Sequence, residues 1–322
     1  RAIALTDLPP GVEMFDLDKS KNSAARNFLV LVYGGYKTGK TDFWNRAKRP
    51  LYVVYLDTNP NLETHLIKSS AEMGEEVYKL VLKPMKYEDL TEEIATDYLT
   101  KIEAFADWAK AHAKERTEQG LYGGLFVLDG GTYLKGYLEK YLLGESVTLG
   151  YRPKRGERSN ISTYDYAKSN GALFDFVAGF TGESLDMVMV FEGRPVWSKS
   201  LDGQNVKTEK WRTTRPDRIP FAVNAEIETL KILQRANPAD NTSPMLSKFA
   251  IRTVFNSENP ELDHLVLPAD NHSMGFDAYK ALLLSDSVGP EVLQAIGAQH
   301  VSEVIRAGNS GLPEMEDDDV EE

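Results

Sequence analysis

The chain has 322 residues, of which 42% are hydrophobic and 27% are charged, and its formal net charge is −12. This composition is typical of a globular protein, and the length suits one large α/β domain with additions, or two domains. The absence of cysteine excludes disulfides, thiolate zinc sites and cysteine nucleophiles.

The negative charge argues against a protein coated in nucleic acid, but it is unevenly spread. The last nine residues, EMEDDDVEE, hold seven carboxylates. Such a block repels itself, so we expect residues 313–322 to form a disordered acidic tail. No apolar run approaches the ~20 residues needed to cross a bilayer, and the first residues lack the pattern of a secretory signal. We therefore expect a cytoplasmic protein, in the host-cell cytoplasm if it is viral, with no membrane partner.

The first half of the chain alternates predicted strands and helices. An irregular lead-in over residues 1–27 precedes a buried strand at 28–33, a glycine-rich loop and a short helix that ends before Pro50. The elements predicted next are a buried strand at 51–59, a short strand within 77–84, an amphipathic helix at 90–117, a buried strand at 123–131 and a helix near 132–143. In the long helix we expect Ile94, Tyr98, Ile102, Phe105 and Trp108 to face the core.

The second half predicts a basic loop at 150–160, a helix at 163–181, a buried strand at 185–193, a polar hairpin at 196–215 and a strand at 225–233. Helical patterns return over 277–307. Strands that alternate with helices indicate an α/β fold with a mostly parallel sheet flanked by helices, plus a small C-terminal helical appendage. We therefore divide the chain into a core at 28–235 and a partly helical extension at 236–312, between the lead-in and the acidic tail.

The glycine-rich loop matches the phosphate-binding pattern G-x-x-x-x-G-K-[ST] in full. Its glycines let backbone N–H groups turn toward a phosphate, and the following helix aims its positive end at the same place. The lysine would reach the β- and γ-phosphates, and the threonine hydroxyl would bind Mg²⁺. The nucleotide-binding residues predicted in this way are Gly34, Gly35, Tyr36, Lys37, Thr38, Gly39, Lys40 and Thr41.

A carboxylate on the magnesium side should follow another buried strand. Asp129, at the end of LFVLD, fits that role, and Asp57 in YVVYLDTN is a second candidate. We therefore expect Thr41, Asp129 and Asp57 as metal ligands, with Lys40 and Asp129 taking part in catalysis.

The order of these elements resembles the RecA-like P-loop ATPases, most closely the phage-encoded recombination ATPases with a single core. The segments that carry the resemblance are YGGYKTGKT, RPLYVVYLDTN, LFVLDGG and MVMVFEG, within residues 28–235. It implies a RecA-like core, ATP and Mg²⁺ as cofactors, and action on single-stranded DNA in recombination, annealing or repair. It also implies a homo-oligomer, as a ring or filament, and a single-strand-binding protein as a further partner.

One position departs from the family pattern. In that family the second strand ends in Asp-x-Glu, and the glutamate activates the attacking water. Here Asn59 stands in its place, and an amide cannot take a proton from water. Glu63, four residues on, would substitute if the loop folds back. We accordingly expect weak ATP hydrolysis.

The resemblance also implies two DNA-contacting loops, on either side of the strand at 185–191. Both loops are basic and contain aromatic residues, a combination that suits phosphate neutralisation and base stacking. The DNA-binding candidates are Arg152, Lys154, Arg155 and Arg158 in the first loop, and Lys199, Lys207, Lys210 and Arg212 in the second. Glu192 and Arg194 lie where this family senses the γ-phosphate, and Arg215 and Arg218 are candidates for an arginine finger.

Two other functions fit the same motif. A small-molecule kinase would use a phosphate loop with a basic lid, for which residues 150–160 would serve. A nucleotide-stabilised assembly protein without enzymatic activity would account for Asn59. We expect the acidic tail to promote solubility. The alternative is that it competes with DNA for the basic loops or recruits a partner.

Overall fold

The computed structural model describes residues 27–35, 37–56, 62–83, 85, 89–143, 163–199, 205–213, 219–236, 240, 242–270, 273–285 and 288–306. Over these residues eleven strands form one continuous arrangement, with the order β10-β9-β8-β7-β1-β5-β4-β2-β3 along the main path. The six strands from β7 to β3 run parallel to one another. The predicted α/β class, with a mostly parallel sheet flanked by helices, is confirmed.

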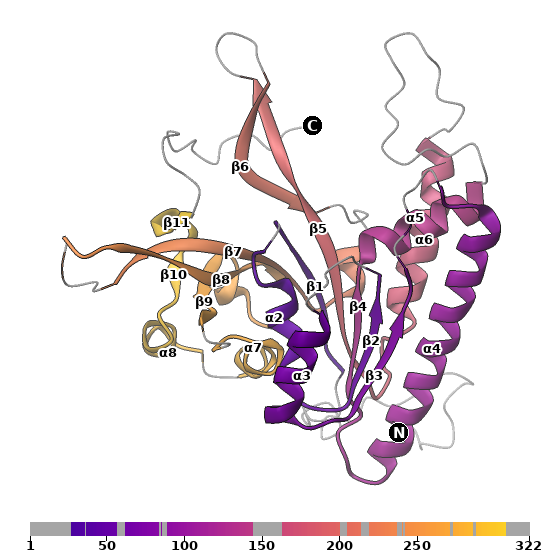
Figure 1. Cartoon of the computed structure of the whole chain (residues 1–322). Coiled ribbons are helices and arrows are strands. Elements are labelled where there is room, and N and C mark those ends of the chain that lie inside the picture. The colour runs from indigo at the N-terminus through magenta and orange to yellow at the C-terminus, as the bar shows by residue number, and fades with distance from the viewer. Residues whose placement is uncertain are drawn as a thin grey trace, which may run out of the picture.

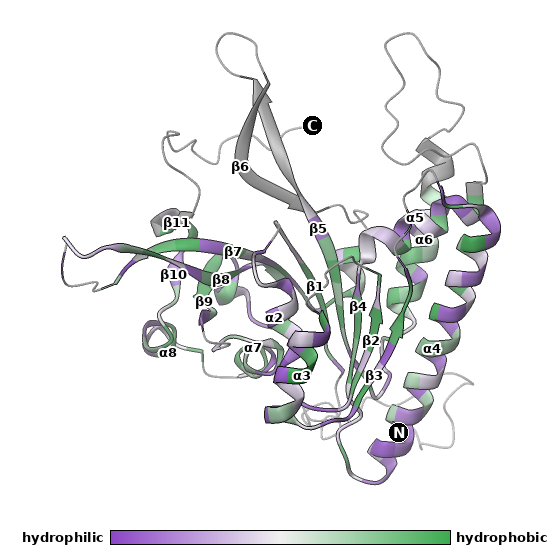
Figure 2. Cartoon of the chain, in the orientation of Figure 1, coloured by the Kyte–Doolittle hydropathy of each residue, from purple (hydrophilic) through white to green (hydrophobic). Residues whose placement is uncertain are grey.

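The parallel strands are β1 (Leu29–Gly34), β2 (Leu51–Tyr55), β3 (Val77–Val81), β4 (Leu125–Asp129), β5 (Asp186–Lys199) and β7 (Ala225–Arg235). Among them, β1, β2 and β4 are short and apolar and are buried on both faces, as a sheet covered on both sides requires. Figure 2 shows the middle of the sheet as its most hydrophobic part. β5 continues beyond β1 and β4, and there it pairs with β6 (Asn205–Thr213) as an antiparallel hairpin (Figure 1). This hairpin confirms the one predicted at 196–215.

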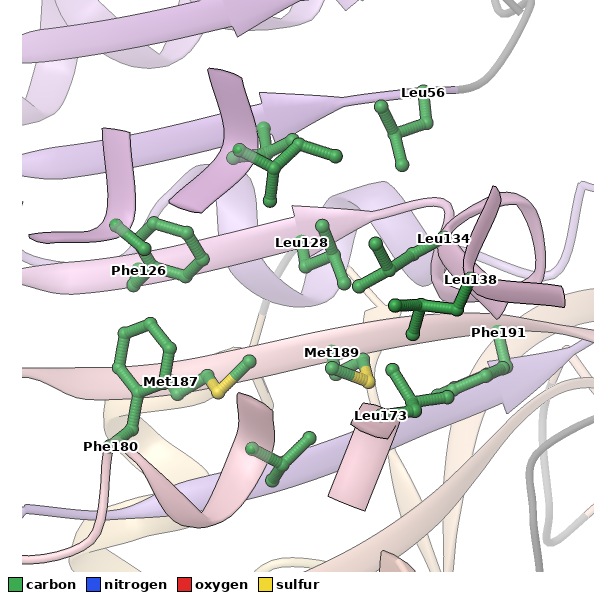
Figure 3. Close-up of a cluster of buried hydrophobic side chains, with 14 of the residues drawn as sticks. Leu56, Phe126, Leu128, Leu134, Leu138, Leu173, Phe180, Met187, Met189 and Phe191 are labelled. Carbon is green, nitrogen blue, oxygen red and sulfur yellow. The ribbon is translucent and has the colours of Figure 1, made fainter. Parts of the chain in front are cut away.

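Helices cover the two faces of the sheet. One face holds α2 (Lys40–Asn45), α3 (Leu62–Met73) and α7 (Phe276–Leu283), and the other holds α4 (Glu92–Glu118), α5 (Gly131–Leu143) and α6 (Thr163–Ala178) (Figure 1). In Figure 3, leucines from α5 and α6 meet Leu128, Met189 and Phe191 of the strands. Side chains of a strand alternate between the two faces, so odd and even residues of each strand join different clusters.

The predicted core stripe of the long helix is largely confirmed, because Ile102 is buried in the core and Ile94, Tyr98 and Phe105 are partly buried and pack against it. The fully buried side of α4 is formed by Ala95, Leu99, Ile102, Ala106, Ala109 and Ala113, whereas Trp108 is 44% exposed. Small alanines let this helix lie close to the sheet. Trp108 instead stacks on Phe105 and His112 at the rim of the core.

The division at residue 235 is wrong, because the chain beyond it continues the same sheet. β8 (Met245–Asn256) pairs with β7 along its whole length, and β9 (Leu265–Pro268) pairs with β8, both antiparallel. Ile251 and Leu267 from these strands join the same core cluster as α2 and α7. Residues 245–268 are therefore part of the core and not of a helical appendage.

The helical pattern predicted up to residue 307 is correct only in part. α7 forms, and α8 (Pro290–Ala295) is short, after which the chain returns to the sheet as β10 (Gln299–His300), with a 3-10 turn (Val301–Glu303), and β11 (Ile305–Arg306). Val301 and Val304 cover Leu230, Ile232 and Ala250 there. Burial of these apolar residues of β7 and β8 overrides the local helical pattern. Among the described helices, none is both long and apolar enough to cross a membrane.

Asp186, at the amino end of β5, ties the C-terminal region to the sheet. Its carboxylate accepts hydrogen bonds from the Phe28 backbone N–H at 2.7 Å and the Tyr122 hydroxyl at 2.7 Å, and Lys280 of α7 donates to both oxygens at 2.8 and 2.7 Å. Burial and the Asp186 charge raise the pKa of Tyr122, which keeps the phenol a donor. These contacts hold three distant segments together at the edge of the sheet opposite the glycine-rich loop.

Candidate nucleotide site

The loop between β1 and α2 has the backbone conformation that a phosphate cradle needs. Lys37 and Gly39 both adopt left-handed conformations, with φ of 57° and 94°, and Gly39 caps a helix that begins at Lys40, as expected. Left-handed residues within a turn direct successive N–H groups to one side, where they can face an anion. Tyr36 lies outside the described residues.

Threonine hydroxyls fasten this loop to β7. Thr38 Oγ1 lies 2.9 Å from the Gly35 carbonyl oxygen and 2.8 Å from Thr229 Oγ1, and the Thr229 hydroxyl is 3.3 Å from the Tyr33 carbonyl oxygen. Gly34 passes so close to β7 that a Cβ atom there would lie 2.5 Å from the Thr229 carbonyl oxygen. These contacts fix the position of the loop against β7.

Lys40 directs its ammonium group into the curve of the loop. Nζ donates to the carbonyl oxygens of Gly34 at 3.0 Å and Gly35 at 2.8 Å. An ammonium held by neutral carbonyls can exchange them for phosphate oxygens, which form stronger, charge-assisted hydrogen bonds. Thr41 follows directly at the start of α2, so the predicted cation and hydroxyl are brought to the same place.

Asp129 ends β4 at the same carboxyl edge of the sheet. Its side chain is 4% exposed, and it follows Leu125 and Val127, which face α2. By alternation, Asp129 also faces α2. The strand order places β5 between β1 and β4, so the two strand ends are two spacings, about 10 Å, apart. Lys40 and Asp129 therefore belong to elements on the same face and at the same edge of the sheet.

The oxygen donors present fit Mg²⁺, which prefers carboxylate and hydroxyl oxygens and usually keeps waters and substrate phosphates as its other ligands. Thr41 and Asp129 supply one donor of each kind. Within the described part of the chain no group of three or more His, Asp or Glu side chains forms a ready cation cage. Asp57 and Asn59 lie outside the described residues.

The structure does not bring Glu63 to the phosphate loop. Glu63 lies at the start of α3 and forms an ion pair with Lys79 of β3, with its side chain 68% exposed. β3 is the edge strand, four strand spacings or about 19 Å from β1. The expectation that Glu63 substitutes for the missing catalytic glutamate is therefore corrected.

A polar group lies behind the loop, on the opposite face. Arg252 of β8 pairs with the buried Glu228 of β7 at 2.9 Å, and Glu228 lies opposite Tyr33 in the sheet register. Burial and the Glu228 charge raise the pKa of the Tyr33 phenol to about 12. Tyr33 therefore stays neutral near pH 7 and is not a base for the site.

The predicted DNA-contacting residues are described only in part. Arg152, Lys154, Arg155 and Arg158 lie outside the described residues. Lys199 ends β5, and Lys207, Lys210 and Arg212 lie on β6. The backbone of this hairpin projects from the carboxyl edge of the sheet, the edge that holds the phosphate loop (Figure 1).

Sequence reasoning missed the part that β7 and β8 play in the site. Thr229 anchors the loop, and the Phe249 ring lies against Gly39, with its Cδ1 3.3 Å from where a Cβ would be. Both residues line a small cavity beside Thr38 and Gly39. No local motif signals these contacts, because each joins residues about 190 to 210 positions apart. Compared with protein-family models the chain matches none, and no curated protein sequence matches it.

Proposed function

We propose that this protein binds ATP with Mg²⁺ and hydrolyses it, as a RecA-like ATPase acting on single-stranded DNA in recombination, annealing or repair. The observation that carries the proposal is the Lys40 ammonium inside the loop, with Asp129 on the same face at the same edge of the sheet. The loop binds the phosphate chain through backbone N–H groups, and Lys40 draws charge from the phosphate oxygens. When bound, Mg²⁺ would use Thr41 and Asp129 and neutralise charge that develops on the phosphates.

Replacing Lys40 by alanine is expected to weaken binding of Mg-ATP about 10- to 100-fold, because a charge-assisted hydrogen bond contributes about 1.5–3 kcal/mol. Isothermal titration calorimetry on the full chain measures this. Lys101→Ala, which removes a half-exposed lysine of α4, is the matched control and should bind like the wild type. Equal affinity in the Lys40→Ala and control variants would contradict the proposal.

The DNA part of the proposal rests on the hairpin formed by β5 and β6. Its residues 193–213 contain five basic and two acidic residues, in a protein of net charge −12. A basic arm beside the nucleotide loop is suited to contact a strand whose binding depends on the nucleotide. A homo-oligomer, ring or filament, would align several such arms along one strand.

Changing Lys207 and Lys210 together to alanine is expected to lower single-stranded DNA affinity and to flatten its salt dependence. Losing two phosphate contacts should reduce the slope of log K against log salt by about 1.4. Fluorescence anisotropy of a labelled oligonucleotide, with and without ATP at several salt concentrations, gives the slope. The control removes Lys101 and Lys114 from α4. An equal slope in both double variants would show that the hairpin does not contact DNA. ATP turnover that requires a small-molecule acceptor would instead favour the kinase alternative.

A further inference from the structure

Glu192 is the carboxylate that the sheet register brings nearest to the phosphate loop. β5 is one of the two direct parallel neighbours of β1, and Gly34 pairs with Glu192. Parallel neighbours lie about 4.8 Å apart, whereas Asp129 belongs to a strand one spacing further away. Lys40 Nζ is 3.0 Å from the carbonyl oxygen of that same Gly34. The ammonium that would hold the γ-phosphate therefore lies beside the backbone of Glu192.

The side chain of Glu192 lies on the correct face of the sheet. Val188 and Val190 belong to the cluster that contains α2, and Phe191 belongs to the opposite cluster, beside Leu138 and Leu173 (Figure 3). Alternation along β5 consequently places Glu192 on the α2 face, which it shares with Asp129. Glu192 is exposed, so both water and a bound phosphate can reach it.

The backbone at this position is held by the neighbouring strand end. The Glu192 N–H donates to Thr132 Oγ1 at 3.0 Å, and Thr132 lies in the first turn of α5, three residues after Asp129. This bond links the middle of β5 to the first turn of α5, which directly follows β4. The two carboxylates are thus carried on one connected piece of the sheet edge, which limits how far their spacing can vary.

We propose that Glu192 is the catalytic base of ATP hydrolysis in this chain. Asn59 cannot take this role because an amide does not accept a proton from water, and Glu63 lies too far from the phosphate loop. The inference rests on the proposed function. The oxygen of a water molecule forms a bond to the γ-phosphorus, and its proton passes to the Glu192 carboxylate. The bond between the γ-phosphorus and the bridging oxygen breaks, and ADP leaves with that electron pair. Glu192 then returns its proton to solvent.

The test is Glu192→Gln, which keeps the size of the side chain and removes its basicity. Single-turnover hydrolysis of Mg-ATP, with single-stranded DNA present, should slow by 10²- to 10⁴-fold, the usual effect of a general base. The dissociation constant for Mg-ATP should stay within about threefold. Glu103→Gln on the exposed side of α4 is the matched control and should leave both quantities unchanged.

Several results would overturn the assignment. One is turnover in Glu192→Gln within threefold of the wild type, and another is a large loss in Glu63→Gln instead. Loss of nucleotide binding in Glu192→Gln would assign the residue to binding and not to proton transfer. Wild-type protein that binds Mg-ATP without hydrolysing it would also refute a catalytic base while leaving nucleotide binding intact. Wild-type protein that fails to bind Mg-ATP would refute the proposed function itself.

Discussion

Gly34→Ala is expected to abolish the proposed nucleotide binding, with a loss of more than 100-fold in affinity for Mg-ATP. A Cβ atom at residue 34 would lie 2.3 Å from Thr229 Oγ1, 2.5 Å from the Thr229 carbonyl oxygen and 2.6 Å from Thr38 Oγ1. A hydroxyl can rotate away, but the carbonyl belongs to a strand paired on both sides. The loop must therefore move, and its hydrogen bonds from Thr38 and Lys40 must break.

The measurement is calorimetric titration of Mg-ATP, together with urea unfolding. Overpacking of this kind costs about 1–3 kcal/mol of unfolding free energy. Gly171→Ala is the matched control, because Gly171 lies within α6 and nothing lies within 4 Å of its Cβ position. The same chemical change should there stabilise the protein by about 0.5–1 kcal/mol and leave affinity unchanged. Normal affinity in Gly34→Ala would show that the contact between the loop and β7 does not shape the site.

Asp186→Ala is expected to lower the free energy of unfolding by about 3–5 kcal/mol, the usual cost of removing one partner from a buried ion pair. Asp186 is 3% exposed, and its loss leaves the Lys280 ammonium, the Tyr122 hydroxyl and the Phe28 N–H without their acceptor. Because Asp186 lies at the amino end of β5, six residues before Glu192, Mg-ATP affinity of the folded fraction should not change.

Urea unfolding monitored by tryptophan fluorescence gives the stability change. Asp97→Ala is a suitable comparison, since Asp97 pairs with Lys101 on α4 and both side chains are about half exposed. An exposed pair contributes at most about 1 kcal/mol. If Asp186→Ala cost no more than Asp97→Ala, the network around Asp186 would not hold α7 to the sheet.

The strands that local pattern predicted best are those buried on both faces. β1, β4 and the part of β5 that pairs with them are runs of apolar residues bounded by glycine or a charge. The bounds of each run in the structure lie within a few residues of the predicted bounds. β8 is absent from the predicted elements, because the apolar residues of MLSKFAIRTVFN come in short runs and do not alternate, and the strand is defined by its pairing with β7. The end of the predicted helix at 290–307 failed for a related reason, since its valines cover a patch of β7 and β8.

For the site, the sequence by itself determined the groups that a short segment carries: the loop from Gly34 to Thr41, and Asp129 at a strand end. Those features depend on spacing within about eight residues and on backbone preferences, which act locally. Only the tertiary structure decided that Thr229 anchors the loop, that Glu63 forms an ion pair with Lys79, and that Glu192 pairs with Gly34 in the sheet register. The physical reason is that strand order and register arise from burying the whole sheet at once. The Thr38–Thr229 and Gly34–Glu192 contacts join residues more than 150 positions apart, and the Glu63–Lys79 pair joins a helix to a strand, so none of them leaves a local pattern.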